Sequence, residues 1–522
     1  MRLGNGSAAV TATTGDVTLT TPALNMTAGA NSVSSTLGDV IVQSNGAGNA
    51  LAVNLGAGSQ INAATAGTGD IFFNPTTAGN ISVTGGPANG LLNAGNTVSY
   101  GGGTVATNVN QINGSVVSNG ATVTTASVTT AAGNLNVGPF TSSGTTAFTA
   151  NGAGANLITS GAIDSGAGNL TLTAGGTGAA DVRINNNVTT TGTLSISSGA
   201  GAGSDVTLAN GVVVTGGVTN VTTPQLTTGT NARLIASTGD LDVQSNAGAL
   251  NVTLGAGSTL VSTNADVGFN RTTAGAITMT GGLGTLQSGG ASPQVIFNGG
   301  NGVNAVNVDV NNIIGCAEGS GTAYSILTQN GDLNVGLTNT SGATTVQTNG
   351  VGSDIITCGN ITSTNGPVTM QAGSGADADI KLNNNVSSGG ALNITSSGGL
   401  NSDVTVATGV TISGATTTVT TPSLVVDGTG IVRSTGAGAD LQISSNATGN
   451  VLSVALNGPT STLQSNSGNV NFNTPGATGA ITVTGGPANG VITANAGNGQ
   501  ANFNGGLANA VDVSVNQINA CI

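Results

Sequence analysis

A five-residue phrase recurs along this chain and constrains its fold more than any other feature. Its form is glycine, Asp or Asn, an aliphatic residue, any residue and a second aliphatic residue, as in GDVTL and GNLTL. The two aliphatic residues share one face of a β-strand, while the Asp or Asn faces water and glycine supplies the preceding turn. Each phrase therefore predicts a turn followed by a short, half-buried strand. Copies begin at Gly15, Gly38, Gly69, Gly79, Gly133, Gly168, Gly239, Gly331 and Gly468.

Strands this short cannot bury their apolar faces alone, but turns stacked on one another build a continuous core, as in solenoid proteins. Gly, Thr, Asn and Val are poor helix formers, so little helix is expected. A string of glycine-rich β-sandwiches is the alternative, although its strands would carry more aromatic residues than the 2% present here. We predict an all-β fold: a right-handed, single-stack parallel β-helix (β-solenoid) with about 20 residues per turn.

The chain also repeats itself at a much longer spacing. TTPAL from Thr20, TTPQL from Thr222 and TTPSL from Thr420 are 202 and 198 residues apart. Similar segments end at Ser115, at Cys316 and at Cys521. We therefore predict internal repeats of about 200 residues. The chain would hold a partial β-helix unit, 1–115, followed by two full units, 116–316 and 317–522.

Aromatic residues follow the same long spacing. An internal stack that fills the coil explains such positions better than a sugar-binding platform on the surface, because Phe is usually buried. We predict that the six repeat-related aromatic residues lie in the core. They are Phe73, Tyr100, Phe269, Phe297, Phe472 and Phe503.

Charge is scarce and mostly negative. Only 5% of the residues are charged, and the formal net charge is −13, from 18 Asp and a single Glu318 against five Arg and Lys381. Without a basic patch, the chain is not expected to bind nucleic acid. No apolar run approaches the ~18 residues that a membrane helix needs, so this segment is not expected to insert into a membrane. A Thr, Asn, Ser and Gly surface with almost no lysine resists trypsin-like proteases and suits an extracellular location.

The phrases GNLTLTAGG from Gly168, GDLNV from Gly331 and GNISVTGG from Gly79 resemble the β-helical shafts of filamentous-haemagglutinin-type adhesins and related autotransporter passengers of bacterial surfaces. The resemblance covers nearly the whole chain but includes no diagnostic site. It implies a long extracellular or cell-surface rod that serves attachment or aggregation, with host or cell-surface glycans as possible partners.

Catalytic chemistry has few residues to use. The chain contains no histidine, which removes Ser-His-Asp triads and His-ligated metals. Catalysis would need paired carboxylates, and the closest pairs are Asp240 with Asp242 and Asp377 with Asp379. Because neither pair has a neighbouring carboxylate cluster, we expect no enzymatic activity, no cofactor and no catalytic or metal-binding residues. A carbohydrate-active β-helix enzyme remains the weaker alternative.

The three cysteines are an odd number. Cys316 and Cys521 occupy the same place in successive units, too far apart for the ~7 Å between Cα atoms that a disulfide allows. They are expected to be buried free thiols or, in the sharper hypothesis, to form a disulfide between chains. Two surface ion pairs are also expected, Asp181 with Arg183 and Asp379 with Lys381.

These observations predict an extracellular structural fibre or adhesin shaft without catalytic activity. The alternative is a protomer that self-assembles head to tail into a filament or a surface layer. Neither terminus changes composition as a solenoid cap would. We therefore expect end-to-end self-association, or a longer repeat protein, with Cys521 near the junction between copies.

Overall fold

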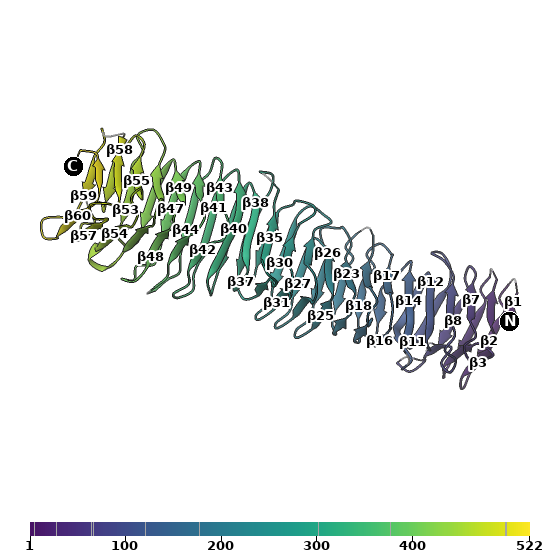
Figure 1. Cartoon of the computed structure of the whole chain (residues 1–522). Coiled ribbons are helices and arrows are strands. Elements are labelled where there is room, and N and C mark those ends of the chain that lie inside the picture. The colour runs from purple at the N-terminus through teal and green to yellow at the C-terminus, as the bar shows by residue number, and fades with distance from the viewer. Residues whose placement is uncertain are drawn as a thin grey trace. The chain divides into compact units, whose positions relative to one another are not determined.

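A computed structural model describes residues 1–4, 6–27, 29–63, 65, 67–120, 122–176, 178–300, 302–375, 377–474, 476–495 and 498–521. The chain folds as an all-β parallel solenoid of about 21 turns, each of about 24 residues, with three sheets (Figure 1). The predicted parallel β-helix is thereby confirmed at the level of fold class. A 3-10 turn, η1 (Thr448–Asn450), lies wholly within these residues, and no helix of the described residues has the length and hydropathy to cross a membrane.

The expected turn length and repeat are not matched. A turn takes about 24 residues instead of about 20, because each turn spends residues on up to three short strands and on the corners between them. The structural repeat is this turn in three sheets, and not a single stack built from units of about 200 residues. Backbone pairing depends only on the neighbouring turn, so hydrogen bonding repeats once per turn even where the residue types repeat every 200.

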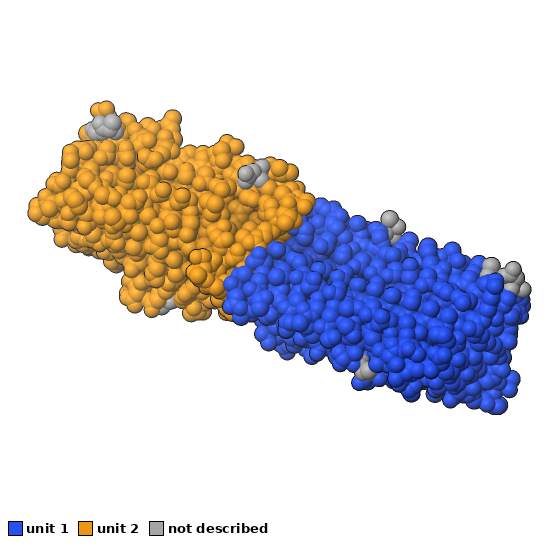
Figure 2. All heavy atoms as spheres, turned by 45° about the vertical axis from the view of Figure 1, so that its right-hand side comes forward, with its two compact units in different colours: residues 1–265 blue, residues 266–522 orange. Residues whose placement is uncertain are grey.

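The structure divides into two compact units, Met1–Ala265 and Asp266–Ile522 (Figure 2). In the first unit, every pairing between named strands is parallel and joins one turn to the next, as between β20 and β23. Its first sheet contains β1 (Arg2–Leu3), β4 (Ala23–Met26), β7 (Leu51–Leu55), β10 (Ile81–Thr84), β12 (Gly103–Val109), β14 (Val123–Thr130), β17 (Thr146–Ala150), β20 (Leu170–Ala174), β23 (Thr193–Ser197), β26 (Val218–Thr222) and β29 (Leu241–Gln244).

The second sheet of this unit branches at β11, which pairs with both β8 and β9. It contains β2 (Ala9–Ala12), β3 (Val17–Thr20), β5 (Ser32–Ser35), β6 (Val40–Gln43), β8 (Gln60–Ala63), β9 (Ile71–Phe73), β11 (Leu91–Tyr100), β13 (Gln111–Ser118), β15 (Leu135–Val137), β18 (Leu157–Thr159), β21 (Val182–Ile184), β24 (Asp205–Leu208), β27 (Gln225–Thr228) and β30 (Leu250–Leu254). The third contains β16 (Phe140–Thr141), β19 (Ile163–Asp164), β22 (Val188–Thr189), β25 (Val213–Gly216), β28 (Arg233–Ala236) and β31 (Thr259–Ser262).

The second unit has the same construction, with a branch at β40, which pairs with both β42 and β43. The branched sheet contains β32 (Val267–Phe269), β35 (Gln294–Asn298), β38 (Cys316–Gly321), β40 (Leu333–Thr340), β42 (Ile355–Thr357), β43 (Ile361–Ser363), β45 (Ile380–Leu382), β46 (Val386–Ser388), β48 (Asp403–Val406), β49 (Thr411–Gly414), β51 (Ser423–Val426), β52 (Ile431–Ser434), β54 (Leu452–Leu456), β55 (Thr462–Ser465), β57 (Ile481–Thr484), β58 (Val491–Ala494), β60 (Val511–Ser514) and β61 (Gln517–Asn519).

A second sheet of this unit contains β33 (Ile277–Thr280), β36 (Ala305–Val310), β39 (Ala323–Thr328), β41 (Thr344–Thr348), β44 (Val368–Gln371), β47 (Ala391–Thr395), β50 (Thr416–Thr420), β53 (Leu441–Ser444), β56 (Val470–Phe472) and β59 (Ala501–Phe503). The remaining strands, β34 (Thr285–Gln287) and β37 (Asn312–Ile314), pair with each other.

The core is built as the five-residue phrase predicts. The alternating aliphatic residues point inward, so that Leu170, Leu172, Val182 and Ile184 are fully buried. Each lies above its counterpart on the next turn, as Leu170 does above Leu194. Small aliphatic side chains stacked in this way remove apolar surface from water along each unit.

The repeat-related aromatic residues pack against one another in the core. Phe73 stacks on Tyr100, Phe269 on Phe297 and Phe472 on Phe503, with ring centroids 5.5, 5.2 and 4.7 Å apart. The first five of these rings are fully buried, and Phe503 is half-buried. The prediction of internal stacking is confirmed, and the rings are not exposed as a sugar platform would be.

Candidate functional site

The Asp or Asn of the five-residue phrase has a structural use at the corners of several turns. Its side-chain oxygen accepts a hydrogen bond from the backbone N–H at the same corner of the next turn. In the first unit, the N–H of Asp39 donates to Asp16 Oδ1 and that of Asp70 to Asp39 Oδ1, both at 2.9 Å. The N–H and hydroxyl of Thr97 then donate to Asp70 Oδ1 at 2.8 Å. These side chains therefore hold consecutive turns together instead of only facing water.

A longer ladder of carboxylates lies in the second unit. The backbone N–H groups of Asp354, Asp379 and Asp403 donate to the carboxylates of Asp332, Asp354 and Asp379, respectively. Lys381 Nζ lies 2.8 Å from Asp354 and 3.3 Å from Asp379, which confirms the second expected ion pair and adds a partner to it. The hydrogen bond to Asp354 is the main cause that raises the pKa of Lys381.

The first unit carries a counterpart of this ladder with fewer charges. Asn156 and Asp181 accept the N–H groups of Asp181 and Asp205, and Arg183 lies 2.8 Å from Asp181, as expected. Burial, followed by the charge of Asp181, raises the pKa of Asp205. The repeated ladders show that charged residues here serve the stacking of turns.

The carboxylate pairs considered for catalysis lie one in each unit. Asp242 lies on β29 between the buried Leu241 and Val243, with Asp240 at the corner before the strand. Asp379 belongs to the ladder and the Lys381 ion pair, whereas Asp377 is an exposed turn residue with a φ of 67°. Within the described residues, no group of three or more His, Cys, Asp or Glu side chains could hold a metal ion.

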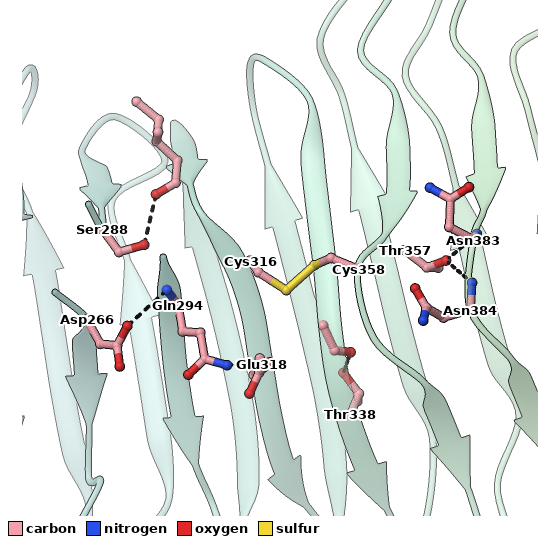
Figure 3. The surroundings of a disulfide bond; sticks show 12 residues. Asp266, Ser288, Gln294, Cys316, Glu318, Thr338, Thr357, Cys358, Asn383 and Asn384 are labelled. Carbon is pink, nitrogen blue, oxygen red and sulfur yellow. Dashed lines mark hydrogen bonds between the residues drawn. A yellow bond between two sulfur atoms is a disulfide. The ribbon is translucent and has the colours of Figure 1, made fainter. Parts of the chain in front are cut away.

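The cysteines differ from the expectation. Cys316, on β38, forms a disulfide with Cys358, directly after β42, with the Cα atoms 6.4 Å apart (Figure 3). Cys316 is thus neither a buried free thiol nor available for a bond between chains, because its sulfur already has a partner within the chain. Cys521 is a free, exposed cysteine.

This disulfide crosses an intervening strand. β38 pairs with β40, and β40 pairs with β42, so the bond joins turns that are not neighbours. It passes over Gly336 of β40, where the register against β38 shifts between Ala317 and Gly319. Glycine at this position leaves room for the sulfur atoms on the outer face of the strand.

An open depression adjoins the disulfide on the outer face of β35, β38 and β40. Its largest part has a volume of about 480 Å3 and is lined by Ser292, Pro293, Gln294, Gly315, Cys316, Glu318, Asn334 and Cys358. A second part, of about 200 Å3, shares Glu318 with the first, and a third, of about 290 Å3, shares Asn339 with the second. The three hollows therefore lie next to one another along the strands, and together they make up the depression.

Polar contacts connect the side chains at this depression. Asp266 Oδ1 accepts the backbone N–H of Gln294 at 3.1 Å, and Asp266 Oδ2 lies 3.0 Å from Arg271. Gln294 Nε2 donates to Glu318 Oε1 at 2.9 Å. Figure 3 places Asp266, Gln294 and Glu318 side by side on consecutive strands. Asp266 thus orients both Gln294 and Arg271.

Glu318 is the one glutamate of the chain and is half-buried. Burial raises its pKa, the charge of Asp266 raises it further, and hydrogen bonds from the Leu337 backbone and from Gln294 oppose this rise. The next residue, Gly319, faces inward against the ring of Tyr324, which fills the space that a Cβ would need. Burial raises the pKa of Tyr324 well above its ordinary value.

Sequence reasoning missed Cys358, Gln294, Glu318 and Arg271 as members of one site. A usable signal was present in the long repeat, because Ser160 stands where the later repeat has Cys358, and Val117 where it has Glu318. Where equivalent positions of two repeats carry side chains of different chemistry, a difference in function between the repeats is indicated.

Comparison of the chain with protein-family models, with curated proteins and with solved structures finds no match.

Proposed function

We propose that this chain is a non-catalytic structural solenoid that serves as an extracellular fibre or as the shaft of a bacterial adhesin. The observation that carries the proposal is the use of its outward carboxylates and amides. Asp16, Asp39 and Asp70 each accept a backbone N–H from the following turn, as do Asp332, Asp354 and Asp379. Side chains that bond neighbouring turns stabilise the stack, which is what a structural solenoid requires of its outward polar residues.

The disulfide supports an extracellular location. Cys316 and Cys358 are bonded at the surface of the second unit, and disulfides persist mainly in oxidising compartments. A right-handed winding completes this proposal, because parallel strands joined by crossover connections are right-handed in about 98% of cases. The resemblance to filamentous-haemagglutinin-type shafts agrees with the same role.

The experiment is immunogold labelling of the cells that produce the protein, before and after permeabilisation. Labelling of intact cells, lost after digestion from outside with a broad-specificity protease, is the expected result. Labelling that appears only after permeabilisation would refute an extracellular role. Incubating the purified chain with surface polysaccharides tests the catalytic alternative: hydrolysis abolished by Asp240→Asn or Asp377→Asn would establish an enzyme.

Self-association of the chain is the second candidate, and the placement of Cys521 favours it. Gln500 pairs with Cys521 as Gln294 pairs with Cys316, so Cys521 has the register position of a cysteine that forms a disulfide. In an oxidising environment, its exposed thiol and that of Cys521 in a second copy can each lose a proton and one electron, forming a disulfide that joins the two chains tail to tail. Light scattering with and without reductant, on the native chain and on Cys521→Ser, tests this. Equal particle size in all four samples would exclude a covalent junction.

A further inference from the structure

The depression at β35, β38 and β40 has a counterpart in the first unit that lacks its charged and covalent features. The strands of the two units pair in the same register here. In the second unit, Gln294 pairs with Cys316, and Cys316 pairs with Asn334. In the first unit, Thr97 pairs with Ser115, and Ser115 pairs with Asn136. At equivalent positions, the first unit has Thr97 where the second has Gln294, and Val117 where the second has Glu318. In place of the disulfide, the first unit has a contact between the hydroxyls of Ser115 and Ser160, which lie 3.0 Å apart.

The first unit therefore demonstrates what the fold needs at these positions. Its stacking bond from Thr97 to Asp70 matches the bond from Gln294 to Asp266. A nearby hollow, of about 320 Å3, has no charged side chain in its lining, which consists of Ser118, Gly120, Thr122, Pro139 and Thr141. The turns of the first unit thus stack without a carboxylate, a long amide or a disulfide at these positions. We infer that these groups have a role other than stacking in the second unit.

Glu318 supplies the negative charge of the depression, whereas the charge of Arg271, in the lining of the second part, is paired with Asp266 at 3.0 Å. Its carboxylate receives Gln294 Nε2 at 2.9 Å, and no ion pair joins it to a basic side chain within the described residues. The largest part of the depression has no basic residue in its lining. A half-buried carboxylate in such a place attracts a cation, because a charge removed partly from water is stabilised by an opposite charge.

Many of the other lining residues carry groups that bind hydroxyls. Amides come from Gln294, Asn298, Asn334 and Asn339, while hydroxyls come from residues such as Ser320 and Ser341. Leu337 adds an exposed apolar surface at the register shift of β40. Amides that donate and accept, together with one apolar contact, suit a ligand with many hydroxyls and a hydrocarbon face.

We propose that this depression binds an oligosaccharide that carries free amino groups, with the Glu318 carboxylate against an ammonium group and the flanking amides against the hydroxyls. Gln294 is a positioning residue, since its hydrogen bond holds the Glu318 carboxylate toward the depression. The proposal goes beyond the structural role above and does not depend on it.

The test uses the whole chain in isothermal titration calorimetry at about 150 mM salt, where surface electrostatics are screened beyond about 8 Å. The probes are a glucosamine tetramer, its fully N-acetylated form and a tetralysine peptide. We expect the glucosamine tetramer to bind at least tenfold more tightly than the other two. Equal affinity for the acetylated form would overturn the role of the ammonium group, and equal affinity for tetralysine would overturn the saccharide assignment.

Variants locate the site. Glu318→Gln should weaken binding of the glucosamine tetramer at least tenfold, and so should Glu318→Val, which introduces the residue that the first unit has at this place. Asp512→Asn removes one charge from an exposed strand position outside the depression and should leave affinity unchanged. Unaltered binding by both Glu318 variants, or an equal loss in Asp512→Asn, would refute the site. Circular dichroism of each variant separates a loss of affinity from a loss of folding.

Discussion

A Cβ atom on Gly336 would lie 2.5 Å from Cys316 Sγ, closer than any carbon and sulfur atoms can pack. The same Cβ would lie 2.6 Å from Glu318 Cγ. Glycine at this point of β40 is thus the condition for the disulfide to pass over the strand. The corresponding Gly138 lies in a similar place, with its Cβ position 2.6 Å from Val117 Cγ1 and 3.5 Å from Ser115 Cβ.

Gly336→Ala should hinder formation of the Cys316–Cys358 disulfide. The methyl group can be accommodated only if the sulfur bridge or the strand moves, and such overpacking costs typically about 1–3 kcal/mol. Titration of free thiols in the unfolded protein should show three thiols for a part of the sample instead of one. Gly138→Ala is the control, because it introduces the same methyl group where no disulfide exists. A complete disulfide in Gly336→Ala, with unchanged thermal stability, would contradict the packing described.

Replacing the disulfide by the serine pair of the first unit should destabilise the second unit. Cys316→Ser with Cys358→Ser recreates the Ser115–Ser160 contact but removes a cross-link between residues 42 positions apart. Loop-closure entropy predicts a loss of up to about 4 kcal/mol at 25 °C. Hydrogen exchange of the Cys358 amide, which donates to the Val335 carbonyl at 2.8 Å, measures this loss locally. Cys521→Ser should leave that amide unaffected, and equal protection in all three proteins would show that the bond adds nothing.

Val182→Asp should destabilise the first unit by about 3 kcal/mol or more, because it places an unpaired carboxylate among buried aliphatic side chains. Val182 is fully buried and pairs with Leu157 and Val206 on the adjacent turns. The neighbouring Asp181→Asn keeps an oxygen that can accept the Asp205 N–H and should change stability by less than about 0.5 kcal/mol. Thermal melting of the two variants measures the difference, and similar melting temperatures would show that the assigned faces are wrong.

Asp205→Asn should stabilise the first unit slightly at neutral pH. Burial and the charge of Asp181 raise the pKa of Asp205. The folded protein then holds this proton more tightly than the unfolded chain, so stability rises as pH falls through the folded pKa. Removing the charge should recover a few tenths of a kcal/mol, a small amount because the site is partly exposed to solvent. Denaturant unfolding measures this gain in the free energy of unfolding, which should vanish at acidic pH. A gain that grows at acidic pH would show that the pKa of Asp205 is lowered by folding and not raised.

Binding of the glucosamine tetramer should weaken as pH falls through the raised pKa of Glu318. The carboxylate binds the ammonium group only when it is ionised, and burial together with the charge of Asp266 moves its protonation to a higher pH. Gln294 and the Leu337 backbone oppose this shift, Arg271 is held by Asp266, and Tyr324 stays neutral. Calorimetry between pH 6 and pH 4 measures the loss, with Glu318→Gln as the control for protonation of the amino groups of the tetramer. An affinity that is constant over this range in the native chain would exclude Glu318 as the contact.

The five-residue phrase was sufficient to predict the strands, their inward faces and the parallel stacking. Leu170, Leu172, Val182 and Ile184 could be assigned to the core because a period of two residues has one physical explanation, a half-buried strand. The aromatic stacks followed from the same logic applied to the long repeat. Turn length could not be predicted, because corners of different length are equally compatible with the same short strands.

The tertiary structure alone decided what the outward residues contact. Sequence spacing places Cys316 and Cys358 42 positions apart and gives no measure of their distance, which depends on how many residues each turn contains. A turn of about 24 residues brings them into two turns that flank β40, and Gly336 lets the bond cross it. Asp266, Gln294 and Glu318 meet for the same reason. In a solenoid, the strand pattern is local and readable, whereas the side chains that meet across turns depend on the accumulated length of every corner between them.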